Sequence, residues 1–226
     1  RFVTNAAVRS LMISRTSEVP VVTGVTIERE GEAPETMTAD IVVQDREELI
    51  YLLCEAAEFE HAVMCTYLYA MWSLKREEAE GVTKDELAAI ERWRLLLRQI
   101  AREEMLHLAL VNNMLTALGS APHLWKPEFP VRPGRFPADV VMKLMPFSAA
   151  ALDHFLYIER PEGVAIPDGA GFEHAHYHRV ARADLLSPAS QDYVSQGHLY
   201  HGIINGFARL TENCGGEKRV FVGHGD

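Results

Sequence analysis

Cysteine, long apolar runs and basic patches are all scarce in this sequence, and each shortage excludes a class of protein. The 226 residues include three cysteines, Cys54, Cys65 and Cys214, without metal-ligand spacing. We therefore expect no disulfide framework and a reducing, cytoplasmic location. No apolar run reaches the ~18 uncharged residues that a membrane-spanning helix needs, so no membrane partner is expected. The 32 acidic residues exceed the 22 basic ones, and the formal net charge of −10 disfavours nucleic-acid binding.

What the sequence does contain is the composition of a folded globular protein, with 48% hydrophobic and 24% charged residues. Residues 1–44 combine short β-branched runs with a stretch rich in Glu, Gly and Pro, which predicts a short irregular or β arm. Residues 45–214 are predicted to form a helical domain, and residues 215–226 a C-terminal tail. The chain begins at Arg1 rather than Met, so we expect the natural N-terminus to lie upstream. Whether a signal peptide has been removed stays open.

Two long amphipathic helices are predicted to open the helical domain. Apolar residues recur at steps of three and four from Leu49 to Leu74 and again from Ile90 to Leu118, which is the period of one helix face. A capping box precedes each run and a glycine follows it. These signals are Asp45 with Glu48 and then Gly81 for the first helix, and Thr83 with Glu86 and then Gly119 for the second.

A long crossover connection is expected next, because residues 120–138 contain five prolines, which interrupt regular structure. A third helix is expected after residue 138, broken at Pro146 and ending by Pro161, and a fourth from Pro188, with the preceding serine as its cap. Four helices with one long crossover predict an all-α four-helix bundle over residues 45–214.

Side chains that can bind a metal interrupt the apolar face of every one of these helices. A lone carboxylate in a bundle core costs several kcal/mol unless it is paired or binds a metal. Such residues at matching depth on four helices need a common partner, and a cation is the simplest. Ferritin-like bundles build di-metal sites in this way, with Glu from two helices and Glu-x-x-His from the other two. The candidate metal ligands are Glu60, Glu104, His107, Glu159, His198 and His201.

The spacing and the residue types also indicate which metals would fit. Glu104 and His107 are three residues apart, so one helix face presents both to the same ion or to a close pair of ions. Carboxylate and imidazole ligands suit iron, and they suit manganese or zinc as well. Whether iron would be di-iron or mononuclear stays open. An unfilled coordination position would bind dioxygen or a small-molecule substrate.

Weaker interpretations stay open for single residues. Glu60 taken alone is compatible with an ion pair to Arg94, Arg98 or Arg102, but the coincidence on four helices favours a metal site. Tyr67 lies two turns beyond Glu60 on the same helix face. Two interpretations stay open for it: a core residue, or a catalytic residue that hydrogen-bonds a ligand or carries a radical. Three further histidines, in a long loop, are more typical of a surface loop than of a ligand set: His174, His176 and His178.

Four stretches that anchor all four helices resemble the ferritin-like domain of the iminophenyl-pyruvate dimer synthase family, which includes enzymes of violacein and rebeccamycin-type pigment assembly. The resemblance implies the six ligands named above, a ferritin-like fold and a role in secondary metabolite biosynthesis. The stretches are AAEFEHAVMCTYLYAMWSL (56–74), IAREEMLHLALVNNMLTALGSAPHL (100–124), PFSAAALDHFLYIERPEG (146–163) and GHLYHGI (197–203).

One position departs from the family pattern. The resemblance implies Gly-Glu-x-Tyr in the last helix, but this chain has Gly-His-Leu-Tyr, with His198 in the place of the glutamate. The loss of one carboxylate leaves a di-metal site with more positive charge, which raises its reduction potential and disfavours high oxidation states. A mononuclear iron or a redox-inactive metal therefore stays open.

The resemblance implies an enzyme, a non-haem metal-dependent oxidoreductase that oxidises or oxidatively couples a small amino-acid-derived metabolite with dioxygen or peroxide. Two other classes stay open. One is a ferritin-like protein that handles iron as a ferroxidase or scavenges peroxide. The other is a non-catalytic bundle that serves as a module in a larger assembly, and self-association into a homo-oligomer is also left open.

Overall fold

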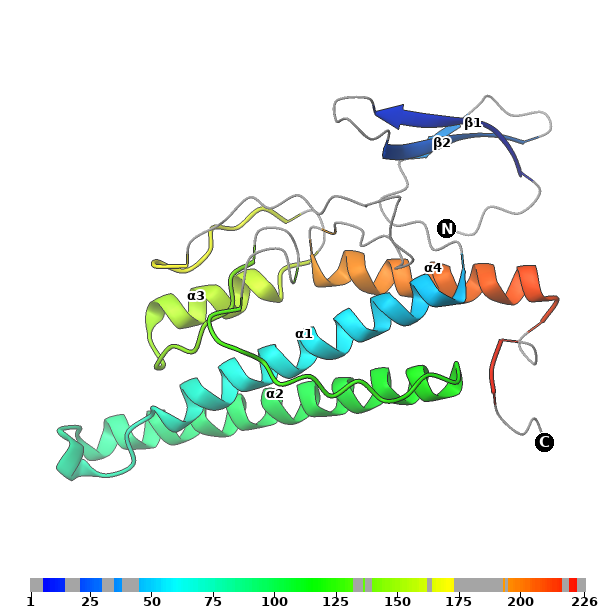
Figure 1. The fold of residues 1–226 in the computed structure, drawn as a ribbon. Coiled ribbons are helices and arrows are strands. Elements are labelled where there is room, and N and C mark those ends of the chain that lie inside the picture. The colour runs from blue at the N-terminus through cyan, green and yellow to red at the C-terminus, as the bar shows by residue number, and fades with distance from the viewer. Residues whose placement is uncertain are drawn as a thin grey trace. The chain divides into compact units, whose positions relative to one another are not determined.

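The protein is described by a computed structural model, in which the chain divides into two compact units, residues 1–42 and 43–226 (Figure 1). The described residues are 6–14, 21–29, 35–37, 45–131, 136, 140–161, 164–172, 193, 195–216 and 220–222. The loop histidines at 174, 176 and 178 lie outside them.

The first unit contains a three-stranded antiparallel sheet with the order β1-β2-β3. Strand β1 (Ala6–Ser14) pairs with β2 (Val21–Arg29), which also pairs with β3 (Glu35–Met37). The register between β1 and β2 shifts twice, as β-bulges do. The predicted β arm is therefore a small sheet.

Two long helices, α1 (Arg46–Trp72) and α2 (Lys84–Ala117), lie side by side in the second unit (Figure 1). Both predicted starts are confirmed, although for α1 the structure shows only the Asp45 half of the predicted capping box. The backbone N–H of Glu48 donates to Oδ1 of Asp45 at 2.9 Å, and the capping box of α2 is complete. The end of α2 is also as predicted, because Gly119 follows it with a left-handed φ of 79°.

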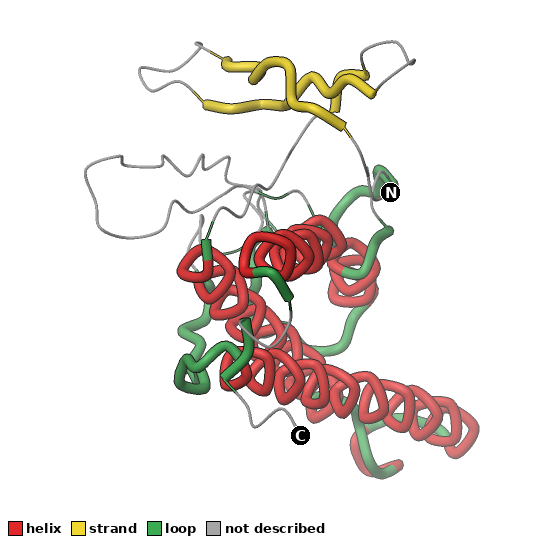
Figure 2. The backbone as a smooth tube through the Cα atoms, turned by 90° about the vertical axis from the view of Figure 1, so that its right-hand side faces the viewer, coloured by secondary structure: helices red, strands yellow, loops and turns green. Residues whose placement is uncertain are grey.

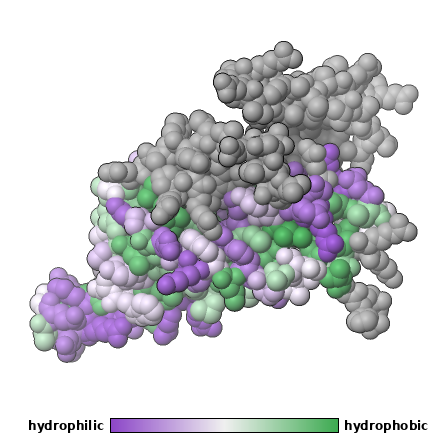
Figure 3. Space-filling view, viewed as in Figure 1, coloured by the Kyte–Doolittle hydropathy of each residue, from purple (hydrophilic) through white to green (hydrophobic). Residues whose placement is uncertain are grey.

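The predicted end of the first helix is wrong. α1 stops at Trp72, and Gly81, with φ of 80°, instead closes a short 3-10 turn over Glu78–Glu80. Five of the six residues from Lys75 to Glu80 are charged, so no apolar side chains continue the buried face of α1. This tip of the α1–α2 pair is strongly hydrophilic in Figure 3.

Helix α3 (Ala149–Ile158) is shorter than the sequence predicts, and its serine cap, Ser148, accepts a hydrogen bond from the N–H of Ala151 at 3.2 Å. Just before it, the N–H of Phe147 donates to Oγ of Ser73 at the end of α1, at 2.7 Å. α3 therefore begins beside the end of α1 and runs back along it.

Helix α4 (Gln196–Cys214) begins at a serine cap, Ser195, which accepts from the N–H of His198 at 3.2 Å. The predicted start at Pro188 lies outside the described residues. The buried face of α4 carries Leu199, Ile203 and Leu210, and this helix packs against α1. Seen after a turn of 90°, the helices are foreshortened, so their axes run in roughly one direction (Figure 2).

The core of the second unit forms around α1. Tyr67 of α1 packs against Phe155 of α3, with ring centroids 4.4 Å apart, and Phe59 packs edge to face on Phe136 of the crossover. Burial of each large apolar side chain contributes about 1.5–3 kcal/mol. None of the described helices is both long and apolar enough to cross a membrane.

Candidate metal centre

Glu60 is the most deeply buried member of the candidate site. All eight residues of the predicted α1 face are buried, and Glu60 stands in the middle of them without exposed surface. Among the described residues, its Oε2 atom has no hydrogen-bond partner. Arg94, one of the alternative ion-pair partners, contacts Glu91 instead. A buried carboxylate oxygen left in this state is costly unless a cation meets it.

Two residues of α2 meet Glu60 from the neighbouring helix. Nδ1 of His107 lies 3.1 Å from Oε2 of Glu104 and 3.4 Å from Oε2 of Glu60. Within the described part of the chain, these three residues alone form a group whose ligand atoms lie within 4.8 Å of one another. The sequence spacing therefore correctly indicated that one face of α2 presents Glu104 and His107 together.

Helix α4 meets Glu60 with residues that the sequence analysis missed. The hydroxyl of Tyr200 donates a hydrogen bond to Oε1 of Glu60, and Nε2 of Gln196 donates to the same oxygen at 3.3 Å. Gln196 and Tyr200 are four residues apart and share a helix face. Tyr200 belongs to the Gly-His-Leu-Tyr stretch that carried part of the resemblance, which was the available signal for it.

The two histidines predicted on the inward face of α4 differ in the structure, which buries His198 and exposes His201. His198 lies two positions from both Gln196 and Tyr200, about 200° around the helix from the face that contacts Glu60. His201 is exposed. His198 is buried, but neither histidine belongs to the group of three. Metal binding by His198 or His201 stays a prediction.

Glu159 reaches the site from the end of α3 through Tyr67. The hydroxyl of Tyr67 donates to Oε1 of Glu159 at 2.9 Å, and the Tyr67 side chain is buried. Burial raises the pKa of Tyr67 above its usual range, and the charges of Glu159, Glu104 and Glu60 act in the same direction. Tyr67 is therefore a protonated hydrogen-bond donor between α1 and α3, outside the group of three.

The charges of the site are unbalanced. Burial raises the pKa of Glu104 to about 8, and the carboxyl groups of Glu60 and Glu159 act in the same direction. The contact with Glu60 raises the pKa of His107 to about 9. Burial alone would raise the pKa of Glu60, but His107, Glu104 and Tyr200 lower it below its usual value. Three carboxyl groups around one imidazole are an arrangement that a bound cation would stabilise.

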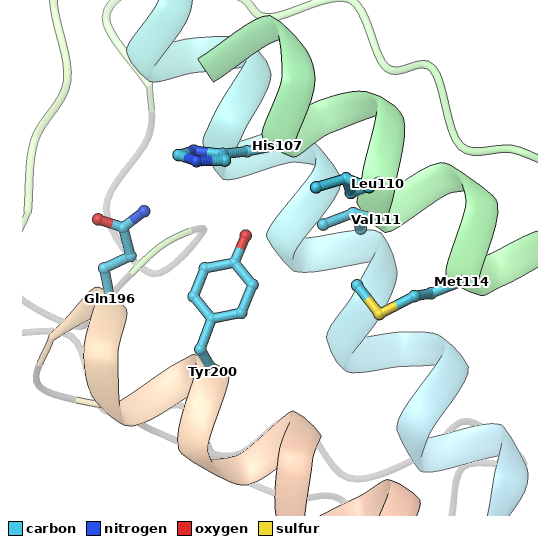
Figure 4. A pocket seen from close by; sticks show the side chains of 6 residues that line it. All are labelled: His107, Leu110, Val111, Met114, Gln196 and Tyr200. Atoms are coloured by element: carbon cyan, nitrogen blue, oxygen red, sulfur yellow. The ribbon is translucent and has the colours of Figure 1, made fainter. Parts of the chain in front are cut away.

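A cavity of about 360 Å³ adjoins the group of three, between α2 and α4 (Figure 4). His107 belongs both to this cavity and to the group, and Tyr200 connects the cavity to Glu60. A small molecule in the cavity would therefore lie beside the candidate metal ligands. The lining residues are His107, Leu110, Val111, Met114, Gln196 and Tyr200.

Two other carboxylate–imidazole pairs lie outside this site. Glu58 faces away from Glu60, as its place on the helix predicts, and its Oε1 lies 2.8 Å from Nε2 of His123. Nδ1 of His154 lies 2.7 Å from Oδ1 of Asp168, and the imidazole stacks on Phe172 with centroids 3.5 Å apart. No motif in the sequence marks the second pair, because Asp168 lies in an irregular segment and pairs with α3 only in the fold.

The described residues fit a cation in number and in kind. Two carboxylates and one imidazole suit iron, manganese or zinc. Oε2 of buried Glu60 makes no hydrogen bond within the described residues and contacts Nδ1 of His107 at 3.4 Å, so it is the position where a bond to a metal ion would form. Three protein ligands leave further coordination positions for water or a substrate.

Comparison with known proteins agrees with this fold. The family model described as Ferritin-like matches residues 53–226. Dichlorochromopyrrolate synthase from Lentzea aerocolonigenes is 28% identical over 208 residues, which cover 80% of this chain and 19% of that protein. No solved structure gave a significant match.

A second relative is 2-imino-3-(indol-3-yl)propanoate dimerase from Chromobacterium violaceum, which is 28% identical over 142 residues. That match covers 55% of this chain and 14% of the relative. The chain thus spans about a fifth or less of the length of these two curated relatives. Together, the matches confirm the predicted resemblance to the iminophenyl-pyruvate dimer synthase family.

Proposed function

The chain belongs to the ferritin-like family, and from this premise we propose that it is a metal-dependent enzyme that oxidatively couples a small amino-acid-derived imine. The observation that carries the proposal is that the Glu60–Glu104–His107 group adjoins a small-molecule cavity through His107. The names of the relatives support the substrate class, because one of them is a dimerase of a 2-imino-3-(indol-3-yl)propanoate.

The proposed ligands of one metal ion are Glu60, Glu104 and His107, with iron as the first candidate and manganese or zinc as alternatives. Tyr200 and Gln196 hold Oε1 of Glu60 and leave its Oε2 oxygen for the ion. Glu159 lies near enough to influence these ligands electrostatically, but it stands outside their group. One ion rather than two is therefore the arrangement that these contacts favour.

The proposed reaction joins two imine molecules by a carbon–carbon bond. The coupling releases two protons and two electrons, which dioxygen takes up as hydrogen peroxide, or which hydrogen peroxide takes up as two molecules of water. Iron or manganese, when bound, would supply the electron transfer to the oxidant, whereas zinc could occupy the same ligands but has no redox chemistry. Tyr67 and Glu159 are placed to hold a proton, because the Tyr67 hydroxyl already donates to Oε1 of Glu159.

The cytoplasm is the proposed location. All three cysteines are free thiols, which is the usual state of cysteine in a reducing compartment.

The test measures bound metal and coupling together in the purified chain. The protein is expressed with added iron, and its metal content is determined. The imine is then generated in situ from tryptophan by an amino-acid oxidase, under air. We expect about one metal equivalent and a product of twice the imine mass less two hydrogens. E104Q should lose both, whereas E103Q, which changes an exposed neighbour on α2, should keep both.

Fewer than ~0.5 metal equivalents, with the E104Q variant unchanged, would contradict the metal site. Bound metal without any coupled product would contradict the coupling reaction. Rapid oxidation of ferrous iron without an organic substrate would instead favour an iron-handling protein.

A further inference from the structure

The cavity between α2 and α4 has two chemically different ends. Its α2 wall runs from His107 to Met114, seven residues or about 10 Å along the helix axis. Gln196 begins the α4 wall opposite His107, and the ring of Tyr200 follows one turn later (Figure 4). Polar groups therefore gather where the cavity meets the metal centre.

The other end of the cavity is apolar. Leu110, Val111 and Met114 offer only aliphatic carbon and a thioether, and the Tyr200 ring lies across from them (Figure 4). Thioethers adapt to irregular shapes and make favourable contacts with aromatic rings. A volume of about 360 Å³ lies near the lower end of the ~300–1,000 Å³ range of small-molecule sites, which suits one ring-bearing acid at a time.

We propose that this cavity fixes the orientation of an aryl-propanoate-type molecule, with its polar end at His107 and Gln196 and its ring between Tyr200 and Met114. Met114 is then the residue that limits the size of the ring. This inference deepens the proposed function and rests on it for the identity of the acid. The binding itself does not require turnover.

The position of Met114 explains why it, rather than its neighbours, sets ring size. Val111 is almost completely buried and contributes to the core, whereas Met114 is partly exposed at the end of the cavity furthest from His107. Met114 is neither one of the three candidate metal ligands nor one of the residues that hold Glu60, so a change there alters the depth of the cavity and keeps those side chains.

The experiment compares the affinities of two acids that lack the α-nitrogen and cannot be coupled as imines, 3-phenylpropanoate and indole-3-propanoate. Both are titrated calorimetrically into the full chain. M114W should weaken indole-3-propanoate about tenfold relative to 3-phenylpropanoate, because the larger side chain overfills the ring end. M114A should shift the ratio of the two affinities in the opposite direction.

M105W is the matched control, because Met105 is an exposed methionine of the same helix outside the cavity. It should leave the ratio within about twofold of the wild-type value. If the ratio is the same in the wild-type, M114W and M114A proteins, Met114 does not set ring size. Failure of the wild-type protein to bind either acid also overturns the inference.

M114A decides the question alone if circular dichroism shows that M114W does not fold. Metal content is measured on every variant and should not change. Ring selectivity that follows Met114 in a protein without coupling activity would overturn the proposed function and leave the binding site intact. Coupling activity without any effect of Met114 on the affinity ratio would overturn the inference about ring size and leave the proposed function intact.

Discussion

The hydroxyl of Tyr200, on α4, donates a hydrogen bond to Oε1 of Glu60, a fully buried carboxylate on α1. Tyr200 also lines the cavity, so one side chain contacts both a candidate metal ligand and the space for a small molecule. The link between the two parts of the site is therefore a direct contact rather than a distant coupling.

The Y200F variant tests this contact, because it keeps the ring and removes only the hydroxyl. A hydrogen bond to a charged group contributes about 1.5–3 kcal/mol. We therefore expect the metal-free variant to melt about 3–8 °C lower than the wild-type protein. Differential scanning calorimetry measures the shift. Y69F is the control, because Tyr69 is an exposed tyrosine of α1, and it should change the melting temperature little.

The pH dependence of stability tests the charges of the metal-free site. The pKa of Glu104 is raised to about 8 and that of His107 to about 9. A group with a higher pKa in the folded state binds its proton more tightly there, so the folded state loses relative stability as pH rises toward that pKa. The urea midpoint of chelator-treated protein should therefore fall from pH 4.5, where Glu104 begins to contribute, to about pH 9, with the contribution of His107 added above pH 6.5.

Removal of one of the two groups should flatten this dependence. E104Q eliminates the contribution of Glu104. E103Q, which changes its exposed neighbour, should keep the full decrease of the urea midpoint with pH. An urea midpoint that rises with pH in the wild-type protein would contradict the assigned directions. Added metal should reduce the fall, because it binds the deprotonated ligands.

The sequence was sufficient to predict the α1 side of the site. The residues of the apolar face of α1 are spaced alternately by four and three, and this spacing places Glu60 among them. The sequence was also sufficient for the pairing of Glu104 with His107, since helix geometry alone sets that relation. The predicted end of α1 failed because the helix already ends at its cap Ser73, whose hydroxyl accepts from the N–H of Phe147, whereas Gly81 closes a separate short turn.

The predicted inward face of α4 matches the buried face at His198 but not at His201, for a physical reason. Steps of three and four placed the two histidines on one face, whereas the buried residues of α4 include the apolar Leu199 and Ile203 beside His198. A shift of one residue on a helix turns a side chain by about 100°. Burial of apolar surface set the orientation of α4, and in this orientation the hydroxyl of Tyr200 reaches Glu60.

Histidine variants can separate the ligands that the structure groups together from those that the sequence alone suggested. H107A should lose most of the bound metal, because it removes one of three ligand atoms within 4.8 Å of one another. H201A should retain the metal, since His201 is exposed and lies outside this group. Elemental analysis of both variants checks this. Loss of metal from H201A would restore that histidine as a ligand.

The buried pair of His154 and Asp168 should govern how firmly α3 is held. Their closest atoms are 2.7 Å apart, and Oδ1 of Asp168 also accepts from the N–H of Gly169 at 2.6 Å. Removal of one partner of a buried pair costs about 3–5 kcal/mol, so D168A should lower the free energy of unfolding by about that amount, as urea denaturation measures.

D153A is the control for that measurement, because Asp153 is an exposed residue of α3 directly before His154. It should change the free energy of unfolding by less than about 0.5 kcal/mol. Glu159 follows the last turn of α3, so D168A should also weaken the contact between Glu159 and Tyr67. If D168A and D153A are equally stable, the His154–Asp168 pair does not hold this helix, and the placement of Glu159 depends on the packing of Phe155 against Tyr67 instead.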